Sequence, residues 1–86
     1  MTIYHVTTNK KAKRYKETGY IKAPVRGFDT LTAAMAWAIK TGRTVIYEMQ
    51  FNKFHKLPDH SNQFGHAYWN EENITEYKCV FSSDKA

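Results

Sequence analysis

Cysteine is almost absent from this chain of 86 residues, in which Cys79 is the only one. One thiol cannot form an internal disulfide, and it cannot supply a zinc site built on paired thiolates. No apolar run approaches the roughly 18 to 20 residues that cross a bilayer, and the first residues lack the basic-then-apolar order of a signal peptide. These absences predict a cytoplasmic protein without a membrane-spanning segment.

The common signatures of nucleophilic catalysis and nucleotide binding are also missing. The sequence contains no G-x-S-x-G, no G-x-x-x-x-G-K and no G-x-G-x-x-G pattern. His55, His60 and His66 lie near Asp59, but spacings of five and six residues match no familiar zinc pattern. We therefore interpret these histidines as surface residues of a polar loop and predict no metal site.

The composition is that of a small folded domain. Hydrophobic residues make up 42% of the chain and aromatic residues 15%, which is ample for a globular core. A chain of 86 residues forms one domain and buries only roughly 60 to 65% of its unfolded surface. We expect a single domain, residues 1 to 86, with a thin core.

Positive charge is concentrated in the first half of the chain. Residues 1 to 43 hold nine Lys and Arg against two acids (+7), whereas residues 44 to 86 hold four against six (−2), which together give the net charge of +5. Five of the basic residues crowd into seven positions: Lys10, Lys11, Lys13, Arg14 and Lys16. Such a density attracts a nucleic acid or an acidic protein partner, although it is also typical of a solvated helix face.

Hydrophobic periodicity predicts a small α+β fold. Strands are expected over residues 2 to 7, 25 to 28, 43 to 51 and 76 to 82, in a mainly antiparallel sheet. One surface helix follows a cap at Thr8 or Asn9, is anchored by Tyr15 and ends at Gly19. A second helix, over residues 31 to 41, should pack on the sheet through one apolar stripe, made of Leu31, Ala34, Met35, Ala38 and Ile39.

The segment from residue 52 to residue 73 is predicted to be a long loop. It carries three histidines and four aromatic residues, which is unusual for a linker. Loops that keep large aromatic side chains are usually pinned to the body of the protein and often functional. A helical turn capped by Asn70 is expected just before the last strand.

Two short motifs give the chain a resemblance to a known family. The first strand contains Tyr4-His5-Val6-Thr7, and the second helix begins within FDTLTAAMAWA, residues 28 to 38. A glutamate, Glu76, opens the last strand. In type and order these elements resemble a compact ADP-ribosyltransferase-like domain.

The resemblance implies a site that binds NAD or another nucleotide. It gives His5, within the motif that includes Thr7, the role of holding the ribose of NAD, and it makes Glu76 the candidate catalytic acid. A carboxylate near a developing positive ribose carbon stabilises it electrostatically, and a neutral imidazole can bond to sugar hydroxyls. Tyr4, Phe28 and Tyr47 are candidates for stacking on nicotinamide or adenine, with ordinary core packing as the alternative.

A second hypothesis does not involve a nucleotide. The chain could be a binding or inhibitor module, of the kind that small phage or mobile-element proteins provide. It would cover a protein or nucleic-acid partner with the basic face of residues 10 to 16 or with the aromatic and histidine-rich loop. The sequence leaves both hypotheses open.

Overall fold

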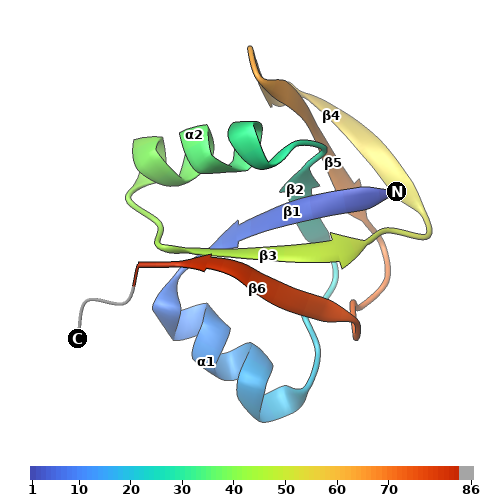
Figure 1. The fold of residues 1–86 in the computed structure, drawn as a ribbon. Helices are drawn as coiled ribbons and strands as arrows, with labels where there is room; N and C mark the ends of the chain where they lie inside the picture. Colours follow the sequence, from blue (N-terminus) through green and yellow to red (C-terminus); the bar gives the residue numbers. More distant parts are fainter. Residues whose placement is uncertain (84–86) are drawn as a thin grey trace.

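The computed structural model describes residues 1–83. Six strands and two helices follow one another along this part of the chain (Figure 1). The strands are β1 (Thr2–Thr7), β2 (Val25–Phe28), β3 (Val45–Gln50), β4 (Phe54–Asn62), β5 (Gly65–Asn70) and β6 (Tyr77–Ser82). The helices are α1 (Asn9–Thr18) and α2 (Leu31–Thr41). The predicted α+β class is confirmed.

All six strands belong to one sheet in the order β4-β5-β2-β1-β3-β6. Every pair of neighbouring strands is antiparallel. The longest regular ladder joins β1 to β3, with six residue pairs that run from Thr2↔Gln50 to Thr7↔Val45. β1 and β2 therefore lie at the centre of the sheet, and β3 lies between β1 and the edge strand β6.

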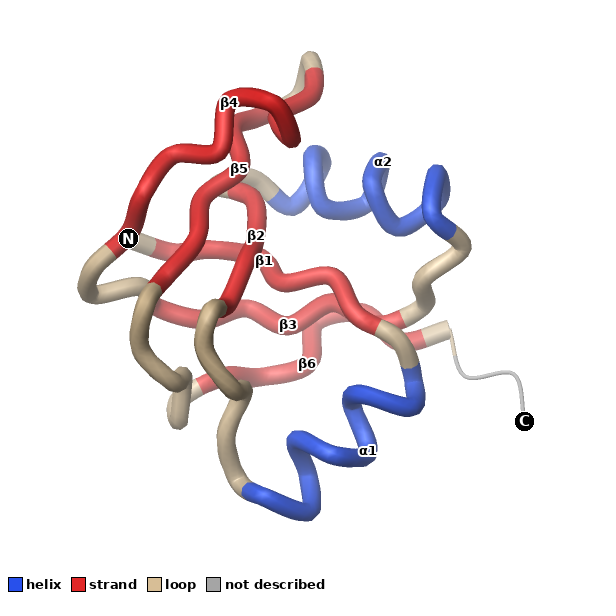
Figure 2. The backbone as a smooth tube through the Cα atoms, turned by 180° about the vertical axis from the view of Figure 1, so that it is seen from behind, coloured by secondary structure: helices blue, strands red, loops and turns tan. Residues whose placement is uncertain are grey.

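The two helices cover opposite faces of the sheet (Figures 1 and 2). Successive side chains of a strand point to opposite faces, and the core divides accordingly. Ile3 packs in a cluster with Tyr15, the single buried residue of α1. Val6 packs in a second cluster with Ala34 of α2. We refer to these two sides as the α1 face and the α2 face.

The helices begin and end where the sequence predicts. The hydroxyls of Thr8 and Thr30 accept hydrogen bonds from amides in the first turns of α1 and α2. Gly19 (φ 84°) and Gly42 (φ 72°) end the helices in the left-handed conformation, which costs glycine little because it has no Cβ. Within residues 1–83, no helix has the length and apolar character needed to span a membrane.

The predicted loop over residues 52 to 73 is wrong, because most of this segment is a β-hairpin. β4 and β5 pair from Phe54↔Asn70 to Asn62↔Gly65. Pro58 is compatible with this arrangement, since β4 is an edge strand and an edge residue needs no ladder donor. The predicted helical turn is absent from residues 70 to 76, where Asn70 ends β5 and its side chain accepts a hydrogen bond from Lys53 and donates one to Glu72.

The predicted apolar stripe of α2 is correct only in part. The helix buries Ala33, Ala34 and Ala38, whereas Leu31 is 42% exposed and Ile39 is 79% exposed. Small alanine side chains let the helix backbone approach the sheet closely, so the helix turns its alanine side inward. Leu31 and Ile39 are thereby directed toward solvent, whereas Met35 is partly buried against the core as predicted.

We expect Ile39→Ser to change the free energy of unfolding by no more than about 0.5 kcal/mol, because a surface side chain with few neighbours contributes little to folding. Chemical denaturation of the variant and the wild type measures the difference. A loss of more than about 1 kcal/mol would contradict the placement of Ile39 in solvent.

Candidate anion-binding site

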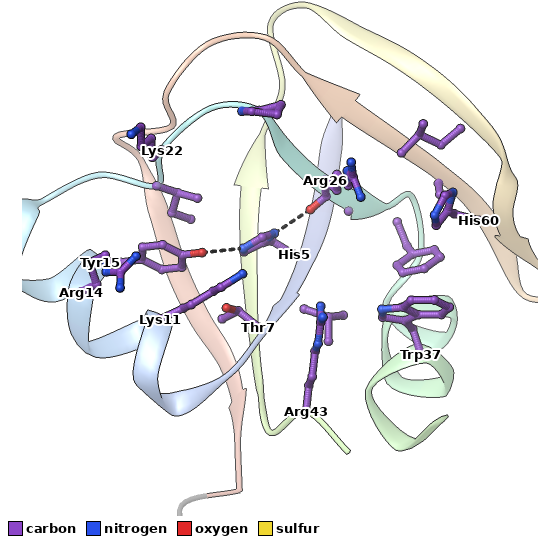
Figure 3. A pocket seen from close by; sticks show the side chains of 17 residues that line it. His5, Thr7, Lys11, Arg14, Tyr15, Lys22, Arg26, Trp37, Arg43 and His60 are labelled. Atoms are coloured by element: carbon purple, nitrogen blue, oxygen red, sulfur yellow. Dashed lines mark hydrogen bonds between the residues drawn. The ribbon is translucent and has the colours of Figure 1, made fainter. Parts of the chain in front are cut away.

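The two central strands β1 and β2 separate soon after they meet. Their ladder is restricted to the pair Tyr4↔Phe28, whereas β1 and β3 stay paired along their whole length. We call the region where they diverge, residues 4–7 of β1 and 25–28 of β2, the seam. A side chain bridges the seam next to this pair, since Nδ1 of His5 lies 2.6 Å from the carbonyl oxygen of Arg26 on β2 (Figure 3).

Both ring nitrogens of His5 are engaged within the protein. A carbonyl oxygen only accepts, so Nδ1–H donates to Arg26 and Nε2 accepts from the hydroxyl of Tyr15 at 3.1 Å. Burial lowers the pKa of His5 to about 4, and the cations Lys11 and Arg43 add to this effect. The imidazole is therefore neutral at pH 7 and ties β1 to both β2 and α1.

A pocket of about 440 Å³ opens at the seam. Its walls come from both sides of the sheet, with Tyr15 and Ile21 from the α1 face and Phe28 and Ala67 from the α2 face. The volume lies in the ~300–1,000 Å³ range typical of small-molecule sites. We call it the seam pocket.

Positive charge dominates the seam pocket. Five basic side chains from α1, β2 and the loops line it: Lys11, Arg14, Lys22, Arg26 and Arg43. None of the pocket's lining residues is an Asp or a Glu. The ion pairs found among residues 1–83 involve other basic groups, namely Lys53, His55 and Lys78.

These five cations are brought together by the topology. Lys11 and Arg43 lie far apart in the sequence, yet both point toward the space next to His5 (Figure 3). Unpaired like charges repel one another, and a bound anion would remove that repulsion. The arrangement is therefore suited to an anionic ligand.

The opposite end of the pocket is aromatic and apolar. Phe28 and Trp37 lie with their ring centroids 6.0 Å apart, and the ring of His60 stands edge-on to Trp37 at 6.4 Å. Leu57 of β4 adds an aliphatic side chain to the same wall. A ligand with one anionic end and one flat apolar end would match both halves of the pocket.

Thr7 adds a buried polar group to the pocket lining. Its side chain is 2% exposed, and its Oγ1 has no hydrogen-bond partner among the described residues. Buried hydroxyls are nearly always paired, so Oγ1 of Thr7 is an exception among the described residues. In Figure 3, Thr7 lies beside Lys11, below His5.

The structure brings together three of the residues that the sequence assigns to a nucleotide site. His5, Thr7 and Phe28 line the seam pocket. Tyr4 does not line it, and its hydroxyl instead donates to Glu48 at 3.4 Å on the α2 face. Tyr47 lines a different hollow, on the α1 face.

Glu76 is also outside the seam pocket. It is an exposed residue between Ile74, which forms a bridge with Ile21, and the start of β6. It lines neither of the two hollows, so this geometry does not bring a carboxylate to His5. The catalytic role that the family resemblance implies for Glu76 stays a prediction.

The basic cluster of residues 10 to 16 divides between two sides of α1. Lys11 and Arg14 line the seam pocket. Lys10, Lys13 and Lys16 line the other hollow, against β3 and β6. A helix rotates by about 100° per residue, so neighbours in the sequence point to different surfaces.

The nucleotide site predicted from the sequence does not include several of the pocket residues, among them Lys22, Arg26, Trp37, Arg43 and His60. Asp29 and Thr30 belong to the motif FDTLTAAMAWA, and their side chains hold the β4–β5 turn. Oδ1 of Asp29 accepts from the amide of His66, and the Thr30 hydroxyl donates to the carbonyl of Phe64. This anchoring brings the hairpin, and with it His60, to α2.

The histidines of the hairpin take separate positions. His55 stacks on Trp69, with ring centroids 4.5 Å apart, and contacts Glu71 at 2.7 Å. His60 lines the seam pocket. Within residues 1–83, no three His, Cys, Asp or Glu side chains lie close enough together to hold a metal ion.

Comparison with protein-family models, curated proteins and solved structures finds no match to this chain.

Proposed function

We propose that this protein binds a phosphate-bearing nucleotide, with NAD as the first candidate, in the seam pocket. The observation that carries the proposal is the set of five basic side chains around a pocket that has no carboxylate in its lining. Phosphate groups are recognised through such donors, and guanidinium groups bind them in a bidentate fashion.

The aromatic end of the pocket supports a nucleotide in preference to inorganic phosphate. A base is flat and apolar on its faces, and Phe28, Trp37 and Leu57 present an apolar wall of that kind. In this arrangement the phosphates lie near Lys11 and Arg43, and the base lies near Trp37. The proposal agrees with the family resemblance, which implies a nucleotide ligand on separate grounds.

The proposal is one of binding. A lining without Asp or Glu provides no carboxylate to stabilise a developing positive ribose carbon. His5 is neutral and has both nitrogens occupied, so it shapes the pocket in preference to holding the ligand directly. A cytoplasmic location agrees with a nucleotide ligand and with the free, exposed thiol of Cys79.

Calorimetric titration tests the proposal with four ligands at low salt: NAD, ADP, AMP and adenosine. Adenosine should bind at least about tenfold more weakly than the phosphate-bearing ligands, since it lacks the charge-assisted contacts. Arg43→Gln should weaken binding of ADP by about tenfold and leave adenosine binding unchanged.

The matched control removes one positive charge far from the pocket. Lys78→Gln on the edge strand β6 should bind ADP as the wild type does, because Lys78 is exposed and β6 contributes no residue to the pocket lining. Flat titrations with all four ligands at millimolar concentration would contradict the proposal. Equal losses in the Arg43 and Lys78 variants would show that net charge alone accounts for binding.

A further inference from the structure

A second hollow, separate from the seam pocket, lies on the α1 face near the edge of the sheet. It has a volume of about 920 Å³ and runs between α1 and the strands β3 and β6. The helix contributes Asn9, Ala12 and three lysines, and the strands contribute Val45, Tyr47, Tyr77, Cys79 and Ser82. We call it the α1–β6 groove.

One wall of the groove is a row of lysines. Lys10, Lys13 and Lys16 recur every third residue on α1, so their Cα atoms rise by about 4.5 Å from one to the next along the helix axis. Ion pairs within residues 1–83 do not include any of the three. The groove lining contains no Asp or Glu. Its chemistry therefore selects a ligand with several negative charges in a line.

The opposite wall is aromatic. Tyr47 and Tyr77 are half-buried, with ring centroids 5.3 Å apart in an edge-to-face arrangement. Burial raises the pKa of Tyr47, and the neighbouring Cys79 and Tyr77 add to the effect, so the phenol is neutral at pH 7. An uncharged aromatic ring does not repel an anionic ligand, and the part of the Tyr47 ring that lines the groove can contact a base.

From these two walls we infer that the α1–β6 groove binds single-stranded nucleic acid. A line of positive charges along one side, with aromatic side chains on the other, is the combination that holds phosphates while bases stack. A duplex hides its bases from the tyrosines.

This inference is independent of the proposed nucleotide site. The seam pocket and the groove share no lining residue. Two charge-matched triple variants separate them, because each lowers the formal charge from +5 to +2. The groove variant is Lys10→Gln with Lys13→Gln and Lys16→Gln. The pocket variant is Lys22→Gln with Arg26→Gln and Arg43→Gln.

Fluorescence anisotropy with a labelled oligothymidine measures binding. The groove variant should lose at least about tenfold in affinity, whereas the pocket variant should stay within about twofold of the wild type. Three phosphate contacts on a single strand give a slope of about −2 in log K against log salt, or about a 20-fold loss between 50 and 200 mM salt. Tyr47→Leu should weaken binding by about tenfold, and Tyr47→Phe should preserve it.

Cys79 provides a readout inside the groove, since it is exposed and is the one cysteine of the chain. Bound oligothymidine should slow the alkylation of Cys79 by iodoacetamide at least about fivefold, an effect that charge attraction elsewhere on the surface would not produce. Inorganic polyphosphate, which has no bases, should bind more weakly than oligothymidine.

Three outcomes would overturn the inference. The first is equal loss of binding in both triple variants, which would mean that net charge alone attracts the oligonucleotide. The second is unchanged alkylation of Cys79 at saturating oligothymidine. The third is tight binding of an acidic peptide, such as oligoglutamate, in place of oligothymidine. Titrations with AMP and ADP report on the seam pocket. If the groove does not bind oligothymidine, those titrations still test the proposed nucleotide site separately.

Discussion

Gly27→Val is expected to lower the free energy of unfolding by at least about 3 kcal/mol, enough to leave much of a small domain unfolded at 37 °C. A Cβ added at Gly27 would lie 2.3 Å from Cγ2 of Ile3 and 2.7 Å from the backbone oxygen of Tyr4. Ile3 is fully buried, and the backbone of β1 is fixed by its ladder with β3. Moving either the Ile3 side chain or the β1 backbone would therefore disrupt native packing or hydrogen bonds. Urea denaturation followed by circular dichroism measures the loss.

Gly19→Ala is the control for this variant. Gly19 has a φ of 84°, but a Cβ there would have open space around it. Its cost should be about 1 kcal/mol, the strain of a left-handed residue alone. Equal stability of the two variants would show that β1 and β2 do not approach one another closely at Gly27.

Acidification from pH 7.5 to pH 5 is expected to remove about 2 kcal/mol of stability through His5 alone. The pKa of His5 is lowered to about 4 in the folded protein, mainly because burial disfavours the charged imidazole. The unfolded chain has a histidine pKa of about 6.5 and therefore binds more protons between the two values. The contribution of His5 to the free energy of unfolding is therefore complete above pH 6.5 and is lost progressively as the pH falls toward 4. Thermal melts at intervals of half a pH unit measure this loss.

Two variants identify the histidine responsible. His5→Gln should be less stable than the wild type at pH 7.5 but should lose little further stability down to pH 5. His66→Gln removes an exposed imidazole and should keep the pH dependence of the wild type. A wild-type melting temperature that stays constant from pH 7.5 to pH 5 would contradict the neutral, hydrogen-bonded state of His5.

Most of the regular structure could be predicted because local signals are strong in these segments. Alternation marks β3, and the pairs Thr8 with Gly19 and Thr30 with Gly42 mark the ends of both helices. The β4–β5 hairpin was not predicted, because both faces of its edge strand are polar or exposed and alternation is then lost. Its position depends on long-range contacts from Asp29 and Thr30, which no local pattern reports.

The candidate site could be predicted only where its residues stand out locally in the sequence. His5 is conspicuous because an imidazole is unusual in a short central strand, and Thr7 and Phe28 lie in motifs. Lys22, Arg26 and Arg43 are ordinary surface residues in the sequence. They become a site only because β1 and β2 diverge, and that divergence is a property of the sheet as a whole.

The seam also determines how the chain is threaded. The strands β1, β3 and β6 lie on one side of it and β2, β5 and β4 on the other, so the polypeptide passes from side to side four times between β1 and β6. Two of these crossings are made by α1 and α2, on opposite faces. Neither side is a continuous stretch of sequence, so no single peptide-bond cleavage releases one of them intact. The sheet can therefore keep a single residue pair between β1 and β2 without dividing into two separately folding pieces.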